Sequence, residues 1–190
     1  MKKIMIVFLC IIFMCNNIDA LSISNKSLFK RVRPKKKTSI KYYPRTKGSI
    51  LVTPDLFKNI LPLGHAAIVY NAQFVYEATN KGVVRGLNNW NITKKRVFGL
   101  RVKNLSNNAH SKAANYAKRQ AKKKYNFNYY NTRIRKKFYC SHLIFASFYD
   151  LFKVNLDTKL FGLAGKRNGA IHPLELVLSK KTKKVYYNER

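Results

Sequence analysis

Residues 138–148 read Phe-Tyr-Cys-Ser-His-Leu-Ile-Phe-Ala-Ser-Phe, and after the cysteine this run is apolar on nearly every side. A helix that is apolar all round is a buried helix, so Cys140 is predicted to be the first residue of a central, buried helix. The N-terminus of a helix carries a partial positive charge and free N–H groups, which both favour the thiolate over the thiol. Cys140 is therefore a candidate nucleophile, and a small buried hydrophobe without chemistry is the alternative.

The first 20 residues have the pattern of a secretory signal peptide. Two lysines precede an apolar run at residues 4–15, and an alanine closes the segment at position 20. The run is shorter than the roughly 20 residues of a transmembrane helix, so a cleaved signal is favoured over an uncleaved anchor. Cleavage would remove Cys10 and Cys15 and leave Cys140 as the single cysteine of a secreted or periplasmic protein. An unpaired cysteine in that setting is a candidate reactive thiol.

The charge of the chain is strongly positive, with 39 Lys+Arg against 7 Asp+Glu and a formal net charge of +32. Such a charge attracts polyanions, so anionic polymers or a membrane surface are possible partners. No nucleic-acid fold signature accompanies it, so nucleic acid is not the expected partner. Residues 21–46 contain a basic run and are predicted to be a flexible arm, and residues 47–190 are predicted to form one domain.

Two predicted strands, at residues 65–70 and 73–78, are close enough in sequence to form a hairpin. The bulky side chains alternate with smaller and polar ones, so one face is predicted to point into the core. His65 and Glu77 share the other face only if the connecting loop has an odd number of residues. A loop at residues 70–72 would place His65 directly opposite Glu77.

A thiolate that hydrolyses amides needs an imidazole beside it and a third group that orients the imidazole. The chain has four histidines. His142 lies about 200° around the helix from Cys140, while the other two candidates, at positions 110 and 172, lie in a lysine-rich helix and a late turn. A Cys140–His65–Glu77 triad is therefore the economical assignment. Each partner taken alone has a simpler alternative: a strand-end histidine, and a carboxylate paired with a lysine.

Several short motifs resemble one known family. They are Gly-Ser-Ile-Leu-Val-Thr at 48–53, Gly-His-Ala-Ala-Ile-Val at 64–69, Val-Tyr-Glu-Ala at 75–78, Gly-Val-Val-Arg at 82–85, Tyr-Cys-Ser at 139–141 and Ile-His-Pro-Leu-Glu-Leu at 171–176. This set resembles the permuted papain-like amidases of the YiiX type, a circularly permuted branch of the NlpC-type cysteine peptidases. The order His, Glu, Cys is the permuted one. The chain departs from the family at Ser49, where relatives usually carry aspartate.

The resemblance implies an α+β, papain-like fold, in which a small antiparallel sheet packs on the central helix that carries Cys140. It implies that Cys140 is the nucleophile, His65 the base and Glu77 the orienting group, with Tyr139 lining the substrate site. It implies no metal and no cofactor. The expected function is a secreted cysteine amidase or peptidase that forms a thioester, with cell-wall peptides as the substrate. The alternatives are a lipid amidase or acyltransferase that takes acyl lipids, and a non-catalytic cationic protein that binds polyanions.

Overall fold

The computed structural model describes residues 42–55, 64–159 and 170–190. The predicted signal peptide and all but the last five residues of the predicted arm lie outside these ranges. The described chain is organised around a six-stranded antiparallel sheet of order β4-β3-β2-β1-β5-β8. Its strands are β1 (Ile50–Thr53), β2 (His65–Val69), β3 (Phe74–Thr79), β4 (Gly82–Leu87), β5 (Arg96–Val102) and β8 (Thr182–Glu189).

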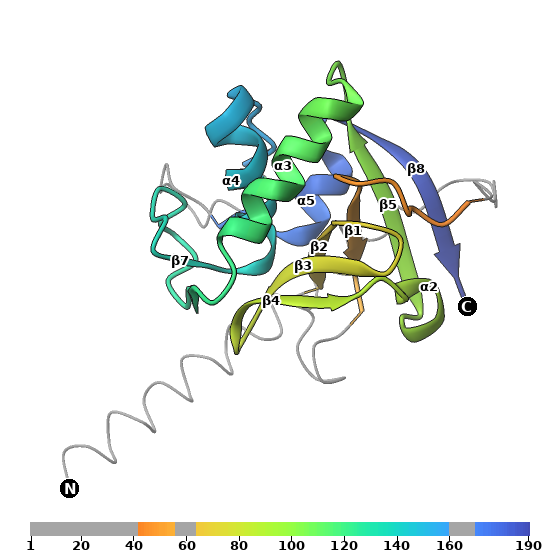
Figure 1. Cartoon of the computed structure of the whole chain (residues 1–190), viewed down its shortest axis with the longest axis horizontal. Helices are drawn as coiled ribbons and strands as arrows, with labels where there is room; N and C mark the ends of the chain where they lie inside the picture. The colour runs from red at the N-terminus through yellow and green to blue at the C-terminus, as the bar shows by residue number, and fades with distance from the viewer. Residues whose placement is uncertain (1–41, 56–63, 160–169) are drawn as a thin grey trace, which may run out of the picture.

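Four helices accompany the sheet in the described ranges: α2 (Trp90–Thr93), α3 (Asn107–Arg119), α4 (Cys140–Phe152) and α5 (Pro173–Leu178). Helices α3, α4 and α5 lie together on one side of the sheet (Figure 1). Two short strands, β6 (Lys124–Tyr125) and β7 (Lys137–Phe138), pair in parallel next to β4, and β7 leads directly into α4. None of the helices in the described ranges combines the length and the apolar composition that crossing a membrane requires. The expected α+β architecture, an antiparallel sheet packed on a central helix that begins at Cys140, is confirmed.

Helix α4 is the buried helix expected from its composition. It begins at Cys140, and every residue from Cys140 to Phe148 is buried. The helix ends at Phe152, after which Lys153 adopts a left-handed conformation with φ 56°. A helix without a polar stripe can be stable only when other elements cover it on all sides, and here β2, β3, α3 and α5 do so.

The sheet separates two apolar clusters because successive side chains of a strand point to opposite faces. Ile68 and Tyr76 belong to the cluster that faces α4, as the alternation in the sequence predicted. Val69 and Val75 belong to the smaller cluster on the other face, together with Trp90 of α2. His65 and Glu77 lie on the face of the smaller cluster, so the predicted sharing of a face is correct.

The predicted register of the β2–β3 hairpin is wrong by two residues. Val69 pairs with Val75, which makes the connection five residues long, and Glu77 therefore stands opposite Ala67. His65 is displaced from Glu77 by one diagonal step on the same face, a separation that long side chains can bridge. The odd loop length was predicted correctly. The two extra residues are Gln73 and Phe74, whose N–H groups donate to Oδ1 of Asn71. Phe74 is the first residue of β3 but pairs only with β4.

The last residues of the predicted arm pack on the sheet. The side chain of Asn88 donates to the backbone oxygen of Pro44 at 3.1 Å, and the N–H of Trp90 donates to the hydroxyl of Tyr43 at 3.1 Å. The ring of Pro44 lies so close to Gly99 that a Cβ there would meet its Cγ at 2.4 Å. Within the described ranges, the packed fold therefore begins at about Tyr43 rather than at residue 47.

Candidate active site

Cys140 occupies the first turn of α4 and is only 7% exposed. Burial by itself raises the pKa of the thiol, because it disfavours the thiolate. The positive charge of His65, a hydrogen bond from His65 and the backbone N–H groups of Ala66 and Ser141 act in the other direction. Their combined effect holds the pKa of Cys140 below its ordinary value. This is the environment expected of a nucleophilic thiolate.

His65 begins β2 and forms a close pair with Glu77 of β3. The Nε2–H of His65 donates to Oε2 of Glu77 at 2.6 Å, and the two side chains are 21% and 15% exposed. Burial lowers the pKa of His65, but the negative charges of the Cys140 thiolate and Glu77, with their hydrogen bonds, prevail and raise it to about 9. Because Glu77 occupies Nε2, the nitrogen available to the thiol is Nδ1.

The thiol and the imidazole meet at the end of the sheet, although they belong to opposite sides of it. Cys140 belongs to the cluster that faces α4, and His65 is in contact with the cluster on the other face. His65 is the first residue of β2, so its side chain can reach around the strand end to the N-terminus of α4. Gly64 precedes it with φ 63°, at a point where a Cβ would lie 2.8 Å from the backbone oxygen of Thr53. This conformation and this close approach both require glycine.

Two residues that the sequence analysis missed hold the His65–Glu77 pair. Trp90, which is 4% exposed, stacks on the imidazole of His65 at 5.5 Å between ring centroids and 28° between ring planes. Gly86 of β4 leaves room for the carboxylate of Glu77, because a Cβ at that position would lie 2.0 Å from Oε1. A glycine inside a strand often indicates that another group approaches the backbone closely, but the sequence does not identify that group. Trp90 is the single tryptophan of the chain, and no spacing rule connects it with His65.

Tyr139 precedes Cys140 and is nearly inaccessible, with 2% of its surface exposed. Its hydroxyl accepts a hydrogen bond from the N–H of Ile171 at 3.0 Å, and its ring packs against Tyr129 at 5.2 Å. These contacts tie the start of α4 to the segment before α5. The structure thus gives Tyr139 a supporting position beside the thiol, and its contact with substrate stays a prediction.

The other three histidines have partners away from Cys140. His110 donates to the backbone oxygen of Ser106 at 2.9 Å and accepts from the N–H of Val102 at 3.2 Å. His172 accepts from the N–H of Leu174 at 3.2 Å as the cap of α5. His142 points into a polar network on the far side of its helix from the triad. Excluding these histidines from the triad on the basis of their sequence positions is therefore consistent with the structure.

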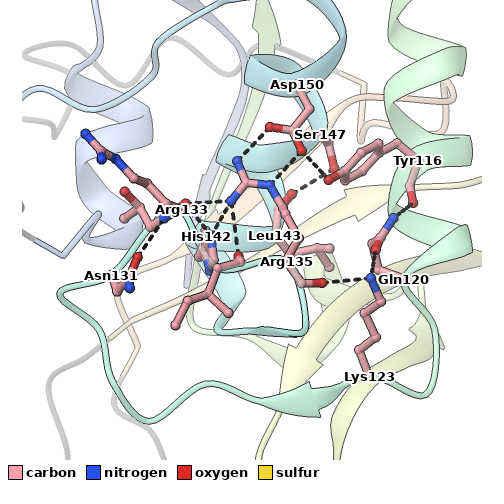
Figure 2. Close-up of polar contacts among 12 residues, drawn as sticks. Tyr116, Gln120, Lys123, Asn131, Arg133, Arg135, His142, Leu143, Ser147 and Asp150 are labelled. Atoms are coloured by element: carbon pink, nitrogen blue, oxygen red, sulfur yellow. Dashed lines mark hydrogen bonds and ion pairs between the residues drawn. The ribbon is translucent and has the colours of Figure 1, made fainter.

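His142 belongs to a network that joins α3, α4 and the loop before β7 (Figure 2). Arg135 forms a bidentate ion pair with Asp150, in which Nε lies 2.6 Å from Oδ2 and Nη2 lies 2.6 Å from Oδ1. The hydroxyl of Tyr116 donates a hydrogen bond to the same carboxylate. The ring of His142 donates to the backbone oxygen of Thr132 at 2.9 Å. Burial lowers the pKa of His142 to about 4, so the ring is neutral at neutral pH.

The described residues provide no group of three His, Cys, Asp or Glu side chains arranged to hold a metal ion. What they bring together is a thiol at a helix N-terminus, an imidazole at a strand end and a carboxylate on the neighbouring strand. An α+β domain in which a cysteine at a helix N-terminus lies beside a histidine and a carboxylate of the sheet has the arrangement of the papain-like class of proteins.

The comparison with protein families narrows this class. Residues 44–170 match the family described as permuted papain-like amidase enzymes, YaeF/YiiX, C92 family, and the chain belongs to it. The chain is also similar in fold to the crystal structure of the metalloprotein yiiX from Escherichia coli O157:H7. That likeness has a TM-score of 0.60 at 18% identity and covers 78% of this chain and 100% of the other. No match was found among the curated proteins.

Proposed function

We propose that this protein is a cysteine amidase in which Cys140, His65 and Glu77 act together. The observation that carries the proposal is the 2.6 Å hydrogen bond from His65 to Glu77, with the raised pKa that His65 acquires beside the Cys140 thiolate. A protonated imidazole next to a thiolate supplies both groups that amide cleavage needs: a nucleophile and a proton for the leaving nitrogen.

The reaction follows from these positions. Sγ of Cys140 attacks the carbonyl carbon of the amide, and the negative charge moves to the carbonyl oxygen, which the N–H of Cys140 at the start of α4 stabilises. The C–N bond then breaks as His65 gives its proton to the leaving nitrogen, and a thioester remains on Cys140. Water attacks the thioester while His65 accepts its proton, and the acid leaves with the thiolate restored. Glu77 holds the ring and stabilises its positive charge throughout.

The proposed substrate is a peptide amide of the bacterial cell wall. The family, which consists of amidases, and the predicted signal peptide support this choice. Acyl lipids are the second substrate class, and an acyltransferase reaction would replace water by another nucleophile in the last step.

Incubation of wild-type protein and Cys140→Ala with purified wall fragments and with lipid extracts tests this proposal. Mass spectrometry should detect new cleavage products with the wild type alone. Iodoacetamide should label Cys140 faster than a free thiol below pH 7, and the labelled protein should lose turnover. A thiol that reacts at the rate of free cysteine would contradict the proposed mechanism.

A second function, binding of anionic polymers or membranes, is favoured by a specific surface feature. A hollow beside the edge strand β4 is lined by Lys81, Arg85 and Lys122, and its lining includes no acidic residue. Binding to an anionic polymer should then weaken log-linearly with salt and survive Cys140→Ala. If such binding survives the substitution and no turnover is found, the non-catalytic alternative is correct.

A further inference from the structure

The segment before β7 differs in composition from the rest of this basic chain. Residues 125–131 read Tyr-Asn-Phe-Asn-Tyr-Tyr-Asn, seven uncharged residues in a chain with 39 Lys+Arg. Phe127 is 69% exposed and Tyr130 is 46% exposed, while Tyr125 and Tyr129 are half-buried. Aromatic surface that remains in water beside a candidate active site indicates a binding surface.

The asparagines of this segment hold it in shape. Oδ1 of Asn126 accepts from the N–H of Asn128 at 3.1 Å, and Oδ1 of Asn128 accepts from the N–H of Tyr130 at 3.3 Å. Asn126 is fully buried. These local turns satisfy the backbone through the asparagine side chains, so the aromatic rings that alternate with them are free to face outward.

Arg135 anchors the end of the segment to α4. Its Nη1 donates to the backbone oxygen of Thr132 at 2.6 Å, while its Nε and Nη2 bond to Asp150 (Figure 2). At the other end, Tyr125 of β6 pairs with Phe138 of β7. The aromatic residues are therefore presented by a segment that is held at both ends.

The segment adjoins the nucleophile. The ring of Tyr129 packs on Tyr139, the residue before Cys140, at 5.2 Å, and Tyr125 packs on Phe127 at 4.8 Å. Burial and the negative charge of the Cys140 thiolate both raise the pKa of Tyr125, which is consistent with this proximity. The rings thus extend from the start of α4 toward the solvent.

We propose that Tyr125, Phe127, Tyr129 and Tyr130 form a wall, here called the aromatic wall, that binds an apolar acyl group of the substrate. This inference rests on the proposed function of Cys140. The leaving group must lie beside His65, which gives it a proton, whereas the acyl carbon bonds to Sγ. Within the described parts of the chain, no hydrogen bond or ring contact joins the aromatic wall to His65. We place the aromatic wall on the acyl side of the scissile bond because Tyr129 contacts Tyr139, the residue before the nucleophile, whereas the ring of Trp90 stacks on His65.

Two esters that differ only in the acyl group test the proposal: 4-nitrophenyl acetate and 4-nitrophenyl octanoate. Wild-type protein should have the higher kcat/KM for the octanoate, and mass spectrometry should find an octanoyl thioester on Cys140. Phe127→Ala and Tyr130→Ala should each lower kcat/KM for the octanoate about tenfold, the effect of removing apolar contact from a hydrophobic site, and leave the acetate unchanged. Leu151→Ala is the matched control, because Leu151 is 38% exposed at the opposite end of α4.

A second measurement does not depend on turnover. N-octanoylglycine should slow the alkylation of Cys140 by iodoacetamide, N-acetylglycine should not, and Phe127→Ala should abolish the protection. Equal protection by the two compounds in the wild type would overturn the proposal. An equal loss of kcat/KM for both esters would overturn it too, because the aromatic wall would then bind the leaving group.

The failure of the inference can be told from the failure of the proposed function. If Cys140 has no enhanced reactivity toward iodoacetamide, the enzyme assignment itself fails. If Cys140 is reactive but the acyl group makes no difference, only the aromatic wall is misassigned. If Phe127→Ala and Tyr130→Ala weaken binding of an oligothymidylate and leave the ester preference intact, the aromatic wall is a platform for nucleobases and the acyl proposal is wrong.

Discussion

Gly86→Ala is expected to inactivate the enzyme through Glu77, a residue on the neighbouring strand. The added Cβ would lie 2.0 Å from Oε1 of Glu77 and 3.1 Å from its Cδ. Moving Oε1 from 2.0 Å to the 3.4 Å of an ordinary contact is a retreat of about 1.4 Å. The His65–Glu77 hydrogen bond has a length of 2.6 Å, and it can lengthen by only about 0.6 Å before it leaves the normal range.

The clash falls on Oε1, whereas Oε2 holds His65. Because the two oxygens belong to one planar carboxylate, the retreat of Oε1 should turn or shift Oε2 and weaken its bond to His65. A misplacement of about 1 Å in a catalytic arrangement can cost on the order of 100-fold in rate, and we expect a loss of this size in kcat/KM. The pKa of His65 should also fall from about 9, because Glu77 contributes to raising it. The variant should still fold, since Oε1 is the far end of a flexible side chain and the strand backbone accepts alanine.

Gly82→Ala is the matched control on the same strand. Gly82 has φ 95°, and its Cβ would lie 2.3 Å from the backbone oxygen of Lys123, which cannot move aside as a side chain can. This variant should lose stability but keep kcat/KM per folded molecule. Thermal unfolding together with active-site titration by iodoacetamide separates the two effects. Full activity of Gly86→Ala in such a comparison would refute the role assigned to Glu77.

Three further results are expected. Glu77→Gln should lower the pKa of His65 and move the alkaline limit of kcat/KM to lower pH, because the neutral amide no longer stabilises the imidazolium that protonates the leaving group. Arg135→Ala should destabilise the fold by about 2 kcal/mol in urea unfolding, because the variant removes a half-buried ion pair with Asp150. Unfolding free energy should also fall as the pH drops from 6.5 toward 4, because His142, with its pKa lowered to about 4, takes up a proton more readily when unfolded.

The controls for these results differ. For the Glu77→Gln prediction, the control is Glu189→Gln, which removes a carboxylate from the edge strand β8 and should leave the pH profile of kcat/KM unchanged. For the second, Arg133→Ala removes an arginine of the same loop whose side chain stays outside the Asp150 pair, and an equal loss of stability would contradict the anchoring role of Arg135. For the pH dependence of the unfolding free energy, His142→Gln should reduce its slope between pH 6.5 and 4. An unchanged slope would show that His142 does not cause the dependence.

The ion pair of Asp150 has its own dependence on pH. Burial raises the pKa of Asp150, but the hydrogen bonds from Arg135 and Tyr116 prevail and lower it. A carboxyl with a lowered pKa stabilises the folded state fully above its ordinary pKa, and the contribution is lost as the pH falls through the lowered value. The Arg135→Ala difference should therefore persist at neutral pH and shrink in acid.

Much of the candidate site could be predicted because it depends on local patterns. The apolar run after Cys140 placed the residue at the start of a buried helix, and the alternation in two strands placed His65 and Glu77 on one face. The direct opposition of these two residues was predicted wrongly, because sequence spacing restricts loop length only to odd numbers. The loop took the longer odd length when Asn71 closed the turn with Phe74.

The sequence by itself therefore determined the buried helix, the position of Cys140 at its start and the shared face of the sheet on which His65 and Glu77 lie. These properties depend on the spacing of apolar residues within a single helix or strand, so each can be recognised from its own segment of the sequence. The tertiary structure alone decided the register of the hairpin, the stacking of Trp90 on His65, the space that Gly86 leaves for Glu77 and the anchoring of the aromatic wall by Arg135. Each of these depends on distances between atoms far apart in the chain, and those distances exist only once the sheet and the helices have packed together.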